Sequence, residues 1–254
     1  MYIERWLKAP MQMPDGTLVA RERGTPQGSP ISPLLANLFM HYAFDRWMGR
    51  EFPGCPFERY ADDIVAHCDT EEQARNLRAA IASRLGALGL ELHPDKTKVV
   101  YCQDGHRRGY SEHTSFDFLG YTFRARPATG RRGRFVSFLP AMSQKARKAK
   151  GLQIRAWHLN RRSGTNLSGL AEDINPQVRG WINFYGAFYR SELCTLAKRI
   201  NEHLVRWAMQ KFKRLRDKPA KAWAWLDAVR QHQPRLFAHW HMLPRTNSRP
   251  VGAG

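Results

Sequence analysis

Hydrophobic and polar positions change their spacing once along the chain of 254 residues. Up to about residue 140, segments with apolar residues at helical spacing are interleaved with short runs of aromatic and β-branched residues. Beyond residue 141, helical spacing continues without such runs. Since a period near 3.6 is typical of helices and such runs are typical of strands, the pattern predicts an α+β region over residues 1–140. An all-helical region over residues 141–245 and a flexible polar tail over residues 246–254 are expected to follow.

The first forty residues predict a helix, a hairpin and a second helix. Residues 1–9 carry an apolar stripe typical of the end of a helix, and the Pro-Asp-Gly sequence at residues 14–16 favours a tight turn. Ser32 is a suitable N-cap, and Pro33 fits the first helical position. We therefore expect a short hairpin around residue 15 and a helix that begins at Ser32.

Two adjacent aspartates lie between apolar and aromatic runs. Residues 57–60 and 64–68 have the composition of strands, and Ala61, Asp62 and Asp63 separate them. This pattern is typical of a hairpin that presents carboxylates at its turn. Most Asp-Asp pairs are solvated turn residues or helix caps, so it is the flanking runs that favour a chemical role.

Further helices and strands are predicted on either side of residue 140. Thr70 with Gln73 forms a capping box, which begins a helix that ends at Gly89. Apolar residues between Leu193 and Phe212 lie on one face of a long helix whose remaining positions are largely basic. Four more segments have the composition of strands: residues 90–92, 98–101, 116–123 and 134–139.

Composition and charge narrow the class of partner. Lys and Arg number 41 against 22 Asp and Glu, which gives a formal net charge of +19. Such a charge attracts polyanions, and nucleic acid is the leading candidate. No apolar run approaches the ~20 residues that a membrane-spanning helix needs, and no signal peptide is present, so we expect no membrane partner and a cytoplasmic, bacterial-type location that includes the nucleoid. The four cysteines are too widely spread for a structural zinc site.

Adjacent carboxylates at a turn favour a bound cation. Two unit negative charges about 4 Å apart repel by roughly 4 kcal/mol at an effective dielectric constant near 20, so such a pair shares a proton or binds a cation. Mg²⁺ prefers oxygen ligands and binds through one or two carboxylates together with substrate phosphates. Two such ions ~3.5–4 Å apart support nucleotidyl transfer. Asp62 and Asp63 are therefore candidate ligands of a two-metal Mg²⁺ site.

Several blocks occur in the order found in the reverse transcriptases of group II introns, and the chain resembles that family over nearly its whole length. Tyr60-Ala61-Asp62-Asp63 is similar to the palm hairpin of the family, and residues 24–37 are similar to the block that lines the templating base and the incoming nucleotide. The resemblance implies that Asp62 and Asp63 are catalytic metal ligands. It implies nucleotide or template contacts for Pro26, Gln27, Gly28, Ser29, Tyr60 and Ala61.

Two further blocks resemble parts of the same polymerase. Residues 92–98 are similar to a block whose lysine approaches the nucleotide phosphates, which implies that Lys96 neutralises charge or donates a proton to pyrophosphate. Residues 116–123 are similar to the primer-gripping strand. The resemblance implies a primer grip at Phe118, Leu119, Gly120 and Tyr121.

The helical region resembles the maturase, or thumb, domain of the same family at residues 175–185. Aromatic residues interleaved with arginines suit single-stranded RNA, which is bound by stacking and charge together. For any one of Trp181, Phe184, Tyr185 and Tyr189, however, packing in the core is the favoured role. The density of basic residues favours RNA contacts at Lys145, Lys148, Arg155, Arg179, Arg199, Lys211 and Arg214.

The resemblance also implies that parts of the polymerase are missing. The palm of the family carries a third metal-binding aspartate on a strand ahead of the region where this chain begins, and neither Asp15 nor Asp45 matches its motif. The fingers are absent as well. We therefore expect an N-terminally truncated form whose two-metal site is incomplete and which makes no cDNA by itself.

The favoured hypothesis is an RNA-directed DNA polymerase and splicing maturase of a group II intron, which acts in retrohoming. The expected partners are the intron RNA, an RNA template with a DNA primer, and dNTPs, together with a second copy of the chain or a complementing N-terminal fragment. A second hypothesis is a non-catalytic remnant that binds intron RNA. A third is the reverse transcriptase of a diversity-generating or defence system, against which the maturase-like segment argues.

Overall fold

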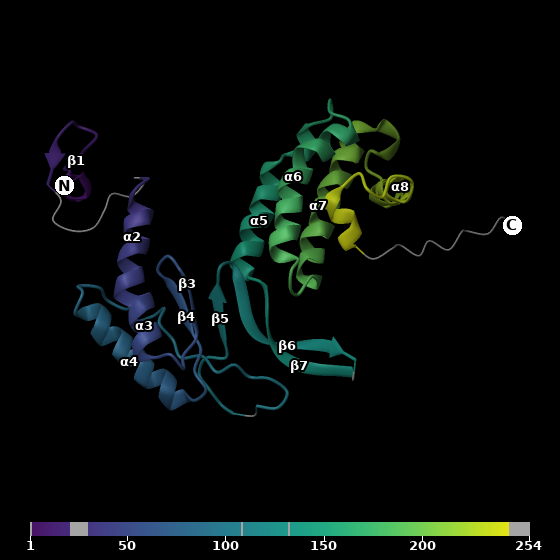
Figure 1. Ribbon diagram of the computed structural model, residues 1–254. Coiled ribbons are helices and arrows are strands. Elements are labelled where there is room, and N and C mark those ends of the chain that lie inside the picture. The colour runs from purple at the N-terminus through teal and green to yellow at the C-terminus, as the bar shows by residue number, and fades with distance from the viewer. Residues whose placement is uncertain (1, 21–29, 108, 132, 244–254) are drawn as a thin grey trace. The chain divides into compact units, whose positions relative to one another are not determined.

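The computed structural model describes residues 2–20, 30–107, 109–131 and 133–243. The chain divides into two compact units, residues 1–99 and residues 100–254. Both contain helices and small antiparallel sheets (Figure 1), which confirms the predicted α+β class. Some predicted features lie outside the described residues: Pro26, Gln27, Gly28, Ser29 and the tail over residues 246–254.

The first unit begins with the helix and the hairpin that its sequence predicts. Helix α1 spans Tyr2–Lys8. Strands β1 (Met11–Gln12) and β2 (Leu18–Val19) pair antiparallel around the Pro-Asp-Gly turn. At this turn the Asp15 carboxylate accepts a hydrogen bond from the Thr17 N–H at 3.0 Å, which is the local interaction that favours aspartate in turns.

A long helix and a shorter one form the helical part of this unit. The long helix comprises α2 (Ser32–Met40), a π-helical turn η1 (His41–Asp45) and α3 (Arg46–Glu51). Its N-cap residue is Ile31, one position before the predicted cap at Ser32. Helix α4 (Glu71–Gly86) begins as predicted, because the Thr70 hydroxyl accepts a hydrogen bond from the Gln73 N–H at 3.1 Å.

The core of the first unit lies between these helices and a hairpin. Strands β3 (Phe57–Tyr60) and β4 (Asp63–Ala66) pair antiparallel. Phe44, Met48 and Leu77 are buried against the hairpin, and the rings of Phe44 and Phe57 meet edge to face at 5.2 Å. The hairpin is therefore held by packing on one face.

Two predicted strands are wrong. Residues 90–92 and 98–101 form no strand. Leu90 follows Gly89, whose φ is +75°, and its N–H donates to the Leu85 carbonyl at 2.9 Å. This bond completes the C-terminal cap of α4. The N–H of Leu90 is therefore bonded to the helix and does not pair with a strand. The backbone N–H of Tyr101 donates one hydrogen bond to the His113 carbonyl. Among the described residues, no ladder of sheet hydrogen bonds continues from it.

The strand predicted over residues 116–123 is instead a hairpin. Strands β5 (Ser115–Phe118) and β6 (Tyr121–Gly130) pair antiparallel, and β7 (Gly133–Met142) pairs with β6 and confirms the strand predicted at residues 134–139. Leu119 and Gly120 form the turn between β5 and β6 with φ values of +50° and +80°. Two consecutive positive φ values suit a two-residue hairpin, but leucine seldom adopts one, so the sequence pattern concealed the turn.

After β7, the regular elements of the second unit are helices. Its helices are α5 (Gln144–Ala156), α6 (Leu167–Tyr185), α7 (Ser191–Lys211) and α8 (Pro219–His232), joined or followed by the 3₁₀ turns η2 (Leu159–Arg161), η3 (Lys213–Leu215) and η4 (Ala238–Met242). Helix α7 contacts α5, α8, η2 and η4. Its buried face, which includes Leu204 and Trp207, forms the centre of the core and confirms the predicted apolar stripe. None of the described helices is both long and apolar enough to cross a membrane.

The sheet β5–β7 belongs to the same compact unit as the helices. β7 ends at Met142 and α5 begins at Gln144, so the secondary structure changes close to residue 140. The contacts, however, divide the chain after residue 99. The domain boundary at residue 140 therefore stays a prediction.

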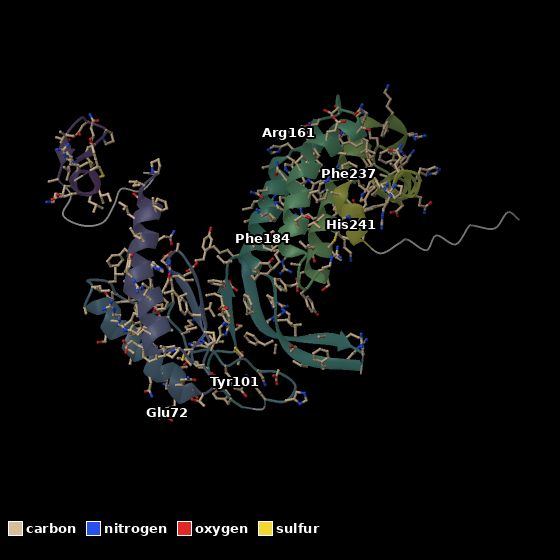
Figure 2. All side chains as sticks on the ribbon, in the orientation of Figure 1. Glu72, Tyr101, Arg161, Phe184, Phe237 and His241 are labelled. Carbon is tan, nitrogen blue, oxygen red and sulfur yellow. The ribbon has the colours of Figure 1, made fainter. Side chains whose placement is uncertain are left out.

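Aromatic side chains join this sheet to the helices. The ring of Tyr121 lies 5.4 Å from the rings of Phe184 and Tyr185, and its hydroxyl donates a hydrogen bond to the Phe184 carbonyl. Figure 2 shows Phe184 at the end of the helices that faces the sheet. The buried guanidinium of Arg126 lies 3.6 Å from the carboxylate of Glu192 on α7. These contacts fix the sheet against the ends of α6 and α7.

Asn175, in the segment that resembles a maturase, is a structural residue. It is buried in α6, its amide donates a hydrogen bond to the Leu236 carbonyl at 2.9 Å, and its carbonyl oxygen accepts one from the Ala238 N–H at 2.8 Å. The side chain therefore satisfies two backbone groups of the segment that enters η4.

Replacement of Asn175 by alanine should lower the free energy of unfolding by about 1–3 kcal/mol, because two backbone groups lose their partner in a buried environment. Urea denaturation followed by tryptophan fluorescence measures this. Asn183→Ala is the matched control, since Asn183 is exposed on the same helix. Equal effects of the two substitutions would contradict the assigned role.

Candidate functional site

The two adjacent aspartates lie at the tip of the β3–β4 hairpin. Tyr60 pairs with Asp63, so Ala61 and Asp62 form a two-residue turn. Both aspartates are exposed, and within the described residues neither forms an ion pair. Ala61 has a φ of +55°, a conformation that costs about 1 kcal/mol or more in a residue other than glycine. The turn therefore needs support from its surroundings.

Arg59 supplies that support. Its Nε and Nη2 atoms lie 2.6 and 2.7 Å from the two carboxylate oxygens of Asp45, which is the bidentate geometry of a strong pair. Its Nη1 donates to the Ala61 carbonyl at 2.9 Å and to the Asn37 side chain at 3.0 Å. The hydrogen bonds from Arg59 hold the pKa of Asp45 below its usual value, so one guanidinium ties the aspartate turn to the long helix.

This clamp was not predicted from the sequence, although the residue pattern contained a signal for it. Phe57 and Arg59 are two residues apart on β3, so they share the face that packs on the helix. The Arg59 side chain is only 10% exposed. A nearly buried arginine requires an acidic partner. Asp45, on the predicted helix, is an acidic residue that could have been identified as that partner.

The site offers two carboxylates to a divalent metal. In the described part of the chain, no group of three or more His, Cys, Asp and Glu side chains is arranged to hold an ion. Two adjacent exposed carboxylates nevertheless fit the way Mg²⁺ binds when substrate phosphates complete its coordination. Asp62 and Asp63 therefore stay the candidate ligands for such an ion.

Lys96 lies in the same unit as the aspartate turn. It is exposed within a turn that follows His93, where the Thr97 N–H donates to the His93 carbonyl at 3.0 Å. Its side chain is therefore free to meet a ligand from solvent.

The residues predicted to grip the primer belong to the second unit. Phe118 and Tyr121 pair across the β5–β6 hairpin, and Leu119 and Gly120 form its turn. A Cβ atom at Gly120 would lie 3.0 Å from the hydroxyl of Tyr185. The glycine is thus required here by its positive φ and by the close approach of α6.

The basic residues predicted to bind RNA differ in their exposure. Lys145, Lys148, Arg155, Arg179 and Arg214 are exposed, and Arg199 is half-buried. Lys211 is engaged within the protein, because its ammonium group donates to the Ser163 carbonyl at 2.7 Å and to the Thr165 carbonyl at 2.9 Å. It also lies 5.5 Å from the centre of the Trp207 ring.

The aromatic residues of the maturase-like segment divide between core and surface. Trp181 is buried and stacks on Trp157 at 5.6 Å, with the ammonium of Lys150 over its ring. Tyr185 is half-buried, whereas Phe184 is 50% exposed. The exposed Phe184 face is therefore the part of this segment that is accessible for stacking.

The structure thus places an exposed carboxylate hairpin in the first unit and basic helices in the second. Residues 1–123 match the family model described as reverse transcriptase (RNA-dependent DNA polymerase), and residues 148–225 match the maturase-specific domain of group II introns. The chain belongs to the group II intron reverse transcriptase/maturase family.

Similar curated proteins cover only part of the chain. Protein P of Hepatitis B virus genotype D (isolate France/alpha1/1989) is 35% identical over 99 residues, which is 39% of this chain and 10% of Protein P. Protein YkfC of Escherichia coli (strain K12) is 31% identical over 187 residues, which covers 61% of this chain and 46% of YkfC. The chain thus spans a tenth to about half of the length of these relatives.

Replacement of Arg59 by lysine should loosen the aspartate turn, because an ammonium cannot make the paired bonds to Asp45 and still reach the Ala61 carbonyl. Loss of charged hydrogen bonds worth about 1.5–3 kcal/mol should speed local hydrogen exchange by about ten-fold or more. Exchange mass spectrometry of a peptide covering residues 57–66 measures this.

The control is Arg50→Lys, since Arg50 pairs with Glu51 in an exposed position, where such pairs contribute little. If both substitutions leave the exchange of residues 57–66 unchanged, Arg59 does not hold the turn.

Proposed function

We propose that this chain provides the carboxylate hairpin of an RNA-directed DNA polymerase and the RNA-binding helices of a group II intron maturase. The observation that carries this proposal is the Arg59-clamped turn, which presents two adjacent aspartates to solvent. The matches to a reverse transcriptase and to a maturase-specific domain, in that order along the chain, support it. The maturase match also disfavours a reverse transcriptase of a diversity-generating or defence system.

In the proposed polymerase, Asp62 and Asp63 are the catalytic metal ligands. Bound Mg²⁺ ions would activate the primer hydroxyl and stabilise the leaving pyrophosphate. Tyr60 and Ala61 position the aspartates and border the nucleotide, with Pro26, Gln27, Gly28 and Ser29 as the proposed template and nucleotide block. Lys96 neutralises the phosphate charge of the incoming dNTP or donates a proton to pyrophosphate.

The second unit carries the proposed contacts with primer and RNA. Phe118, Leu119, Gly120 and Tyr121 are the proposed primer grip. Lys145, Lys148, Arg155, Arg179, Arg199 and Arg214 are the proposed RNA contacts, and Lys211 is left out because its ammonium holds the backbone at Ser163 and Thr165. The proposed partners are intron RNA and a primer on an RNA template, together with a second copy of the chain or a complementing fragment.

We expect the chain by itself to make no cDNA. Two carboxylates without a third ligand in the described residues bind a divalent ion weakly until substrate phosphates contribute. This favours the alternative in which the isolated chain acts only by binding intron RNA.

Primer extension on an RNA template with Mg²⁺ and dNTPs tests the catalytic part. The wild-type chain should yield no more product than its Asp63→Ala variant, because the described residues supply no third ligand beside the two carboxylates. Robust synthesis by the wild type together with none by Asp63→Ala would show that the two carboxylates suffice.

Binding to intron RNA should depend on salt through the helical region. The slope of log K against log salt is negative, and each phosphate contact that is lost reduces its magnitude by about 0.7–0.9. Combined substitution of Lys145, Lys148 and Arg179 by alanine should therefore make the slope shallower, whereas Asp62→Asn with Asp63→Asn should leave binding intact. Filter binding over a salt series measures the affinity and the slope for each variant. If the chain binds unrelated RNA with equal affinity, the binding is due to charge alone and is not specific for intron RNA.

A further inference from the structure

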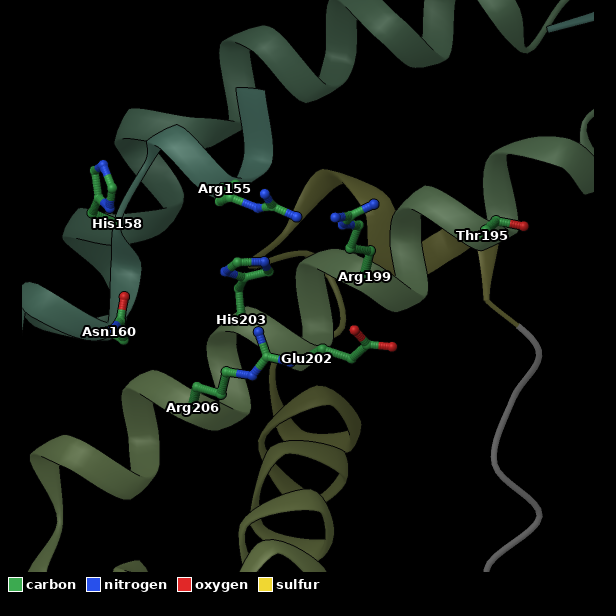
Figure 3. Close-up of a pocket in the computed structure, with 8 residues that line it drawn as sticks. All are labelled: Arg155, His158, Asn160, Thr195, Arg199, Glu202, His203 and Arg206. Atoms are coloured by element: carbon green, nitrogen blue, oxygen red, sulfur yellow. The ribbon is translucent and has the colours of Figure 1, made fainter. Parts of the chain in front are cut away.

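A pocket of about 600 Å³ lies between the end of α5, the turn that follows it and one face of α7. This volume is within the range of ~300–1,000 Å³ that is usual for ligand sites. Arg155 from α5 and Arg199 and Arg206 from α7 line it (Figure 3). The guanidinium groups of Arg155 and Arg199 extend toward each other from the two helices in Figure 3.

The positive charge of this pocket is not balanced by the protein. Within the described part of the chain, none of the three guanidinium groups forms a hydrogen bond or an ion pair. Glu202 is the acidic residue in the lining, and its carboxylate turns away from Arg155 and Arg199 in Figure 3. Burial and the nearby charges of Arg206 and Arg199 lower the pKa of His203, which also lines the pocket. Like charges gathered in this way favour an anion between them.

Helix α5 is built to accommodate Arg199. Gly151 lies in the middle of α5, and a Cβ atom at this position would be 2.7 Å from Arg199 Nη1. A glycine inside a helix lowers the stability of the helix relative to alanine. Here it creates the space in which the guanidinium lies against α5, at the edge of the pocket. The position of Arg199 is therefore set by packing and not by an acidic partner.

We infer that this pocket binds a phosphodiester group of the RNA backbone, held by Arg155, Arg199 and Arg206. The planar guanidinium fork matches the oxygens of a phosphate, and the net charge of the chain favours nucleic acid over a small anion. The inference rests on the proposed RNA-binding function and deepens it. It assigns a defined phosphate site to helices α5 and α7, and it adds Arg206 to the RNA contacts.

Substitution of Gly151 by alanine tests the site without removing any charged group. The new methyl group displaces the Arg199 guanidinium, which is the far end of a flexible side chain, while the helix itself gains stability. Gly180→Ala in α6 is the matched control, because a Cβ atom at Gly180 meets nothing within 4 Å among the described residues. Arg206→Gln is a second variant that removes one charge from the pocket.

The probe is a fluorescein-labelled oligouridylate, and its binding to the full chain is followed by fluorescence anisotropy over a salt series. Gly151→Ala and Arg206→Gln should each weaken binding by about ten-fold, because a charge-assisted contact is lost. Each should also reduce the magnitude of the slope of log K against log salt by about 0.7. Gly180→Ala should match the wild type. Urea unfolding should show no loss of stability in Gly151→Ala.

The outcomes separate this inference from the proposed function. If the wild type binds the RNA and both pocket variants bind it equally well, the phosphate site is wrong and the proposed RNA binding stands. If the wild type does not bind the RNA, the proposed function itself fails. If inorganic phosphate perturbs the Arg199 and Arg206 signals in nuclear magnetic resonance spectra but the RNA does not displace it, the pocket takes a free anion and the assignment to RNA is overturned.

Discussion

Groups of like charge that the protein itself does not neutralise are the constraint on which this structure depends. Asp62 and Asp63 are adjacent in sequence and exposed at the tip of one hairpin, and Arg155, Arg199 and Arg206 line one pocket. Like charges repel at such sites unless a counter-ion is bound. The folded chain therefore has to hold each group in place by other means, and it does so differently in its two units.

In the first unit, a charged clamp holds the acidic group. Arg59 reaches Asp45 with two bonds and the Ala61 carbonyl with a third, so it joins the strained turn to a helix whose Phe44 is completely buried. In the second unit, packing holds the basic group. Gly151 leaves room for Arg199 against α5, and the buried face of α7 keeps the helix that carries Arg199 and Arg206 in register. The first arrangement suits cations and the second suits anions.

Residues that stand out in the family-like segments have structural roles as well. Asn175 satisfies two backbone groups next to η4, Trp181 stacks in the core, and Gly120 is required by the nearby Tyr185 hydroxyl. The similarity of such a segment to a family therefore arises from residues that pack the domain as well as from residues that are proposed to contact RNA. The exposed lysines and arginines of the same helices are the side chains that remain available for phosphates.

The sequence by itself determined where mixed helix and strand gives way to helices alone, the hairpin that carries two adjacent aspartates, the apolar stripe of α7 and the net positive charge that attracts polyanions. These features depend on local periodicity, turn chemistry and total charge, all of which can be read directly from the amino-acid sequence. Only the tertiary structure showed that Arg59 reaches Asp45 from 14 positions away. It also showed that the Lys211 ammonium is hydrogen-bonded to the carbonyls of Ser163 and Thr165. Arg155 and Arg199 share a pocket, which the sequence alone does not reveal. The tertiary structure also turned the predicted strand at residues 116–123 into a hairpin around Leu119 and Gly120. The reason is physical: a side chain's partner depends on which elements pack together, and that choice is made by burial across the whole fold and not by the residues on either side.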